Sequence, residues 1–139
     1  MPSVQFFSEK ITFKPRNQRK LSQWLKKSAK VHGKSISSLH YIFCSDSFLL
    51  GLNKAYLGHN TYTDILTFDL ENDEAVECEV YISVQRVKEN AAEYNVPFDH
   101  EIRRVLAHGL LHLLGFKDKT SQQKARMRQE EEACLSLWN

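Results

Sequence analysis

The segment HGLLHLLGFKD, residues 108–118, carries most of the information in this sequence. His108 and His112 are four residues apart, so on a helix their side chains lie on one face, one turn from each other. Gly115 is a natural helix end, and Asp118 follows three residues later. Two helical imidazoles and a carboxylate beyond the turn predict a three-ligand metal site that leaves one position open for water.

This donor set suits zinc, with nickel, manganese or iron as alternatives. A bound cation would lower the pKa of a coordinated water toward about 7 and supply hydroxide at neutral pH. The alternative is a chance pair of packed histidines, with Asp118 an exposed carboxylate after the helix. Because four leucines make this helix apolar, and burying imidazoles without a partner costs free energy, the metal site is favoured.

The spacing is also that of the metzincin proteases, H-E-x-x-H-x-x-G-x-x-H. Their glutamate takes a proton from the metal-bound water, and Gly109 stands at that position here. A glycine side chain has no group that accepts a proton, so the sequence argues against a peptidase.

The chain has 139 residues, of which 42% are hydrophobic and 26% charged, and its formal net charge is +2. These values indicate a single domain over residues 1–139 with a core of its own. Between Lys10 and Lys34 there are nine lysines and arginines and no acidic residue. Such a segment suits a polyanionic partner, or it is the solvated face of a helix.

The three cysteines, Cys44, Cys78 and Cys134, are far apart in the sequence, which indicates neither a disulfide framework nor a thiolate zinc site. No apolar run approaches the length of about 18 residues that a membrane span needs. The N-terminus also lacks the charged-then-apolar order of a signal peptide. We therefore expect a cytoplasmic protein without a membrane span.

Apolar patterning predicts the elements. The VQFF and ITF segments near the N-terminus are expected to form a short strand pair or one interrupted strand, and further strands are expected over 37–44, 64–70 and 76–84. Helices are expected over 17–31, 45–56, 86–94, 101–114 and 121–137. Without strict strand–helix alternation, the order predicts one α+β domain: a small mixed sheet of about four strands packed with about five helices, including a zincin-like metal-site helix.

Polar residues at the helix ends refine this prediction. Asn17 is the expected cap of the first helix, Ser45 or Asp46 of the second, and Asp99 of the helix that carries the histidines. The acidic patch Glu130, Glu131 and Glu132 is expected on the surface of the last helix, with contact to a basic protein as the alternative.

Together with the metal motif, two further blocks resemble the YbeY family of metal-dependent endoribonucleases, also called rRNA maturation factors. Residues 52–68, LNKAYLGHNTYTDILTF, are similar to the family's Leu-Asn, basic loop and Thr-Asp-Val-Leu-Ser-Phe. Residues 79–94, EVYISVQRVKENAAEY, resemble its Gly-Asp-Ile-x-Ile-Ser strand and the helix that follows. Residues 108–118 are close to its His-Gly-x-Leu-His-Leu-x-Gly-Tyr-Asp-His. Three blocks in the family's order are far more specific than the histidine motif alone.

The resemblance implies a single-domain α+β fold and a metal, usually taken as zinc, held by three side chains. It implies a single-strand-type endoribonuclease in ribosomal RNA processing, especially maturation of the small-subunit RNA 3′ end, and in ribosome quality control. Expected partners are ribosomal RNA and the ribosome or its proteins, with neither DNA nor a membrane. His108 and His112 match the first two ligand positions, and Asp118 stands where most members have a third histidine.

A second departure lies in the loop before the Thr-Asp element. Leu57 falls where many members carry an arginine, which could hold a phosphate or stabilise a pentacoordinate transition state. His59 could partly replace that arginine, or it is an ordinary loop histidine. Thr63 and Asp64 match the Thr-Asp element and act either near the metal or in local backbone hydrogen bonds at the strand start.

The candidates for holding the RNA backbone are Arg86, Arg103 and Arg104, together with the basic N-terminal stretch, although each of the three arginines could equally be a solvated helix charge. The leading interpretation is hydrolysis of an RNA phosphodiester at the metal. The rival, from another class, is a ribosome-associated RNA-binding assembly factor whose metal is structural or vestigial. The departures at Leu57 and Asp118 favour that rival.

Overall fold

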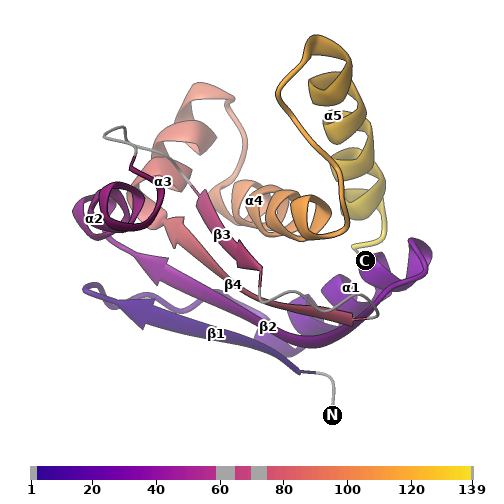
Figure 1. Cartoon of the computed structure of the whole chain (residues 1–139), viewed down its shortest axis with the longest axis horizontal. Coiled ribbons are helices and arrows are strands. Elements are labelled where there is room, and N and C mark those ends of the chain that lie inside the picture. The colour runs from indigo at the N-terminus through magenta and orange to yellow at the C-terminus, as the bar shows by residue number, and fades with distance from the viewer. Residues whose placement is uncertain (1–2, 59–64, 70–74, 139) are drawn as a thin grey trace.

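The structure, a computed structural model, describes residues 3–58, 65–69 and 75–138. Its strands are β1 (Ser3–Glu9), β2 (Ser35–Cys44), β3 (Ile65–Asp69) and β4 (Ala75–Ser83). Its helices are α1 (Gln18–Val31), α2 (Asp46–Leu57), α3 (Val84–Glu93), α4 (Phe98–Leu113) and α5 (Ser121–Ser136). The four strands and five helices of the described residues confirm the predicted α+β fold (Figure 1).

One mixed sheet runs through the molecule in the order β1-β2-β4-β3. The three strands β1, β2 and β4 are parallel, and β3 pairs with β4 in the antiparallel direction. Helix α1 connects β1 to its parallel neighbour β2. Within the described residues β1 and β3 are therefore the two edges of the sheet, and α4 contacts the β3–β4 side.

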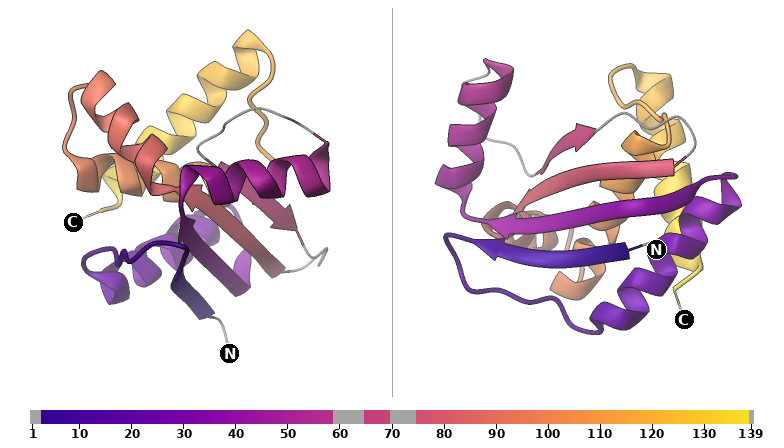
Figure 2. Two further views of the ribbon diagram at one scale, coloured as in Figure 1. Left: turned by 90° about the vertical axis from the view of Figure 1, so that its left-hand side faces the viewer. Right: turned by 60° about the horizontal axis from the view of Figure 1, so that its bottom comes forward.

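The two faces of the sheet carry cores of unequal size. On β2, Leu39, Tyr41 and Phe43 alternate toward the larger core, which also contains the buried side chains of α1 and α4. Cys44 belongs to a small second core, where it is clustered with Leu49 of α2. The right-hand view of Figure 2 shows the strands in front of α4 and α5, so α4, which carries the two histidines, and α5 lie on the same side of the sheet.

Two predictions about the elements are wrong for local reasons, and α4 begins at Phe98 rather than at the predicted Glu101. The ITF segment forms no strand: Ile11 and Phe13 lie in the connector after β1 and pack, partly buried, against the large core. Helix α3 begins at Val84, before the predicted Arg86, because the Ser83 hydroxyl caps the helix by accepting the Arg86 N–H.

The structure confirms the predicted cap residues of α1 and α2 but not that of α4. Ser45, one of the two candidates for α2, accepts the N–H of Phe48 and is the cap. Asn17 precedes α1 as predicted, although its side chain makes no capping hydrogen bond. For α4 the prediction is wrong, because Pro97 is the N-cap residue and Asp99 lies inside the first turn. There its negative charge suits the positive end of the helix dipole.

The cysteines are free and buried at positions 44, 78 and 134. Burial, together with the charges of Asp46 and Glu9, raises the pKa of the Cys44 thiol to about 12. This thiol is therefore not a thiolate at neutral pH. In the part of the chain that the structure describes, no helix has the length and apolar character that crossing a membrane requires.

Helix α4 packs very closely on the sheet at Gly109. A Cβ atom built at this position would lie 3.0 Å from Ile65 Cδ1 and 3.1 Å from Val80 Cγ1. The Tyr41 hydroxyl, fully buried, donates to the Leu106 carbonyl at 2.8 Å and fixes the same helix one turn earlier. Position 109 thus faces the sheet, and a glutamate of the protease type has no room there.

We predict that Gly109→Val lowers the free energy of unfolding by about 1–3 kcal/mol, because the added methyl groups must displace Ile65 and Val80. Gly51→Val in α2 is the matched control, since a Cβ at Gly51 meets nothing within 4 Å. Urea unfolding of both variants measures the difference, and equal midpoints would contradict the close packing of α4.

Candidate metal centre

Three donor atoms converge where α4 ends. Nε2 of His108 and Nε2 of His112 lie 3.0 Å apart, and each lies 3.3 Å from Oδ2 of Asp118. Ligand atoms placed at about 2.0–2.1 Å around a tetrahedral zinc ion are separated by about 3.3–3.4 Å. The three spacings therefore suit one small cation, and these side chains form a possible metal-binding group of the described residues.

The turn after α4 brings the carboxylate to the histidines. Gly115 has a backbone φ of 105°, a conformation that residues other than glycine rarely adopt. Its N–H donates to the His112 carbonyl, and the Phe116 N–H donates to the Leu111 carbonyl, as in a Schellman turn. The chain therefore reverses within one turn, and Asp118 returns to the side of the helix that carries the imidazoles.

Both imidazoles are oriented through Nδ1. Nδ1 of His108 lies 2.6 Å from Oε2 of Glu131. Nδ1 of His112 lies 3.0 Å from the Phe116 carbonyl oxygen. Because both oxygens accept, we assign the hydrogen of each ring to Nδ1, which leaves the lone pair on Nε2. Two lone pairs 3.0 Å apart repel each other, and a cation shared with Asp118 removes that repulsion. The donor set therefore fits a divalent metal.

Glu131 was predicted on the surface of the last helix, and this prediction is wrong. Glu131 is only 6% exposed, because α5 packs on α4 at this point. Met127 and Cys134, four residues before it and three after it, are buried as well. This helical spacing around Glu131 is the sequence signal that marks its face as the buried one.

A buried ion network supports Glu131. The Arg104 guanidinium lies between two carboxylates, 3.3 Å from Oε1 of Glu131 and 2.6 Å from Oε2 of Glu101. Burial alone would lower the pKa of Arg104, but the hydrogen bonds and charges of Glu101 and Glu131 raise it above its usual value. Arg104 therefore stays charged and orients the Glu131 carboxylate toward His108.

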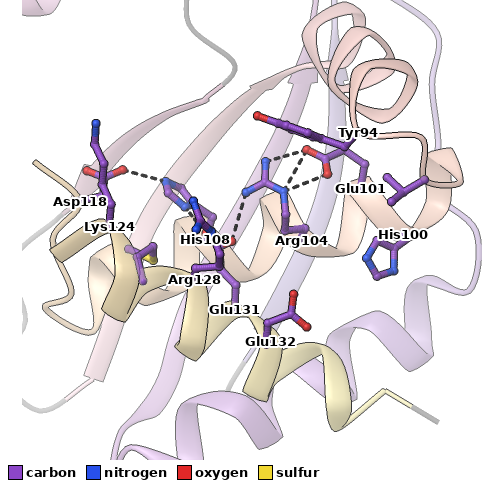
Figure 3. A pocket seen from close by; sticks show the side chains of 12 residues that line it. Tyr94, His100, Glu101, Arg104, His108, Asp118, Lys124, Arg128, Glu131 and Glu132 are labelled. Carbon is purple, nitrogen blue, oxygen red and sulfur yellow. Dashed lines mark hydrogen bonds and ion pairs between the residues drawn. The ribbon is translucent and has the colours of Figure 1, made fainter. Parts of the chain in front are cut away.

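An open groove of about 570 Å³ borders the site, lined mainly by α4 and α5. Asp118 and Lys124 stand at one end of it, and Tyr94 and His100 stand at the other, with His108 between them (Figure 3). Two of the three predicted ligands, His108 and Asp118, thus border an open groove.

Of the three predicted arginines, the structure brings Arg104 to this groove. Arg86 instead pairs with Asp46, at 3.0 Å and 3.2 Å from its two oxygens, and so joins α3 to α2. The Arg103 guanidinium lies 4.8 Å from the centre of the Trp138 ring. Neither of these two arginines is among the described residues that line the groove.

Three predicted positions cannot be placed relative to the site. His59, Thr63 and Asp64 fall within 59–64, outside the described residues. Leu57 is the last residue of α2. The roles considered for these residues stay predictions.

The sequence matches the family model described as "Endoribonuclease YbeY" over residues 3–139. A relative named Endoribonuclease YbeY from Cytophaga hutchinsonii is 46% identical over 138 residues, covering 97% of this chain and 95% of the relative. A relative of the same name from Christiangramia forsetii is 40% identical over 136 residues, covering 98% of this chain and 94% of that relative. Each of these two matches extends over nearly the whole length of this chain and of the relative.

A solved structure shares the fold. The solution structure of TM1509 from Thermotoga maritima superposes with a TM-score of 0.67 and covers 97% of this chain and 88% of its own. At 24% sequence identity, the likeness supports the architecture alone.

We predict that Glu131→Gln weakens metal binding. Glutamine still offers an oxygen to His108 Nδ1, but without the negative charge it orients and polarises the imidazole less well. The zinc Kd should rise about 10–100-fold in competition with a chromophoric chelator. Glu132→Gln, which alters the exposed neighbouring carboxylate in the same groove, is the control and should leave the Kd unchanged. The same Kd for both variants would rule out a role for Glu131 at the metal.

Proposed function

Because the chain belongs to the endoribonuclease YbeY family, we propose that it is a metal-dependent endoribonuclease that hydrolyses phosphodiester bonds of ribosomal RNA. The relatives that it matches are named as endoribonucleases, which supports an RNA-cleaving hydrolase in rRNA processing. The single observation that carries metal dependence is the convergence of two imidazole Nε2 atoms and one carboxylate oxygen within 3.3 Å.

His108, His112 and Asp118 would hold the metal, and zinc is the first choice for two nitrogen donors and one oxygen donor. When bound, such a cation polarises a phosphoryl oxygen and lowers the pKa of a coordinated water. An aspartate as third ligand makes the site one charge less positive than a third histidine would. It also makes the site more suitable for a harder cation such as manganese.

The residues around the ligands have separable tasks. Glu131 and the Phe116 carbonyl hold the two imidazole rings with their Nε2 atoms toward the common point. Lys124 and Arg128, exposed on the α5 side of the groove, are suited to phosphate oxygens of a strand that passes the ligands. Arg104 supports the site through Glu131.

Further contacts to the RNA from Arg86, Arg103, Arg104 and His59 remain part of the proposal. The substrate that we propose is a single-stranded segment of ribosomal RNA, in particular the 3′ end of the small-subunit RNA. Action on the ribosome, in the cytoplasm and in ribosome quality control, belongs to the same proposal.

The rival function is an RNA-binding ribosome assembly factor with a structural or vestigial metal. One observation speaks against a vestigial site: the substituted third position still presents a donor atom, Asp118 Oδ2, at the same 3.3 Å from both imidazoles. A ligand variant that stays folded and binds RNA distinguishes the two functions.

We expect His112→Ala and a chelator each to abolish cleavage of a labelled ribosomal RNA fragment, since both remove the metal while leaving the cations of the groove in place. The unaltered protein and the variant are purified in parallel, with thermal unfolding and RNA binding as controls. Equal cutting by both preparations would reveal a contaminating nuclease. No cutting by either, with RNA binding intact, would favour the assembly factor.

If Asp118 is the third ligand, two substitutions at this position should have opposite effects on zinc binding. Asp118→Ala should raise the zinc Kd at least about tenfold, because it removes one of three protein ligands. Asp118→His supplies the residue that the family resemblance places there, and it should retain zinc binding and RNA cleavage. An alanine variant with the affinity of the unaltered protein would show that Asp118 is not a ligand.

A further inference from the structure

A second groove follows the outer edge of β1, away from the metal ligands. It consists of two adjoining cavities of about 550 and 460 Å³, which share Phe6, Phe7 and Gln18. One wall is the edge strand β1, and the other is formed by α1 and the connector before it. The metal ligands lie on α4 and after it, and α4 contacts the opposite side of the sheet, at β3 and β4.

This edge groove is positively charged. Lys14, Arg19 and Lys26 line it, and no acidic residue is among the described residues that line either cavity. The exposed face of α1 continues the charge with Lys27 and Lys30. The basic segment predicted from the sequence is therefore not dispersed over the surface: part of it forms the wall of a groove.

The metal-site groove has a different balance. Its three cations, Arg104, Lys124 and Arg128, are set against four carboxylates, those of Glu101, Asp118, Glu131 and Glu132. Three positive and four negative charges give a formal charge of −1, which a divalent metal changes to +1. The edge groove has three positive charges and none that are negative among its described lining residues. The stronger attraction for a polyanion thus lies at β1 and α1.

Some of the other side chains that line the edge groove also suit a nucleic-acid surface. Gln5, Gln18, Ser22 and Gln23 supply hydrogen-bond donors and acceptors between the cations. Phe7, which is 44% exposed, adds an aromatic surface at which a base can stack. A cationic groove with amides and an aromatic side chain can hold single-stranded RNA without strong sequence preference.

We propose that the groove between β1 and α1 binds the phosphate backbone of the RNA substrate, at a distance from the bond that is cut. This inference rests on the proposed function, because it assigns a part of the same RNA to a second surface. The metal-site groove positions the cleaved segment, while Lys14, Arg19 and Lys26 supply much of the affinity. An acidic peptide that adds a strand to the β1 edge is the competing occupant.

The test uses the double variant Arg19→Gln/Lys26→Gln and the matched control Lys54→Gln/Lys88→Gln, which removes two exposed charges from α2 and α3. Binding of a single-stranded ribosomal RNA fragment is measured with chelator present, so that no cleavage interferes. At moderate salt the groove variant should bind about tenfold more weakly, and the slope of log Kd against log salt should fall by about 1.4, or 0.7 for each lost phosphate contact. The control variant should keep the Kd and slope of the unaltered protein.

Failure of this proposal can be told from failure of the proposed function. An unaltered Kd and slope in the groove variant, or an equal loss in the control, would overturn the proposal even if the unaltered protein cuts RNA. An acidic peptide on the β1 edge would then be the occupant to test. If the unaltered protein does not cut but the groove variant alone loses RNA affinity, the groove proposal stands and the nuclease assignment fails. Where cleavage is observed, the groove variant should raise KM and leave kcat unchanged.

Discussion

The close contact of α4 with the sheet at Gly109 determines where the two histidines of the predicted metal site point. With no side chain at this position, the helix backbone approaches Ile65 and Val80 so closely that a Cβ would lie 3.0–3.1 Å from them. The face of α4 that carries Gly109 is thus fixed against the sheet. His108 and His112 lie on another side of the same helix, where α5 and the turn after Gly115 can reach them.

The second constraint is the hydrogen bond of 2.6 Å between His108 and Glu131, which joins α5 to α4. A buried carboxylate is costly unless it is paired, and Arg104 with Glu101 completes the pairing. Removing Glu131 would leave His108 Nδ1 without its acceptor and Arg104 with one carboxylate instead of two. The network makes the orientation of the His108 imidazole depend on the packing of α5 against α4.

The sequence predicted the site as far as local geometry determines it. Both histidines stand on one helix and Gly115 ends that helix, so spacing alone brings Asp118 near them. Glu131 is 23 residues from His108, and only the packing of α5 on α4 reveals their contact. For the same reason the sequence indicates Arg104 only as a candidate RNA ligand or a solvated helix charge, and does not indicate its ion pair with Glu131. The edge groove was not foreseen, because the residues of β1 that complete it precede the basic segment.

The aspartate at position 118 links the two grooves through charge. A neutral histidine in its place would leave the metal-site groove with three carboxylates against three cations, instead of four against three. Long-range attraction for RNA falls as negative charge accumulates beside the metal, because each carboxylate opposes the phosphates. A surface remote from the metal can restore that attraction without altering the ligand set. The basic groove at β1 and α1 has the charge and position for this task, so affinity and cleavage can depend on different residues of one small domain.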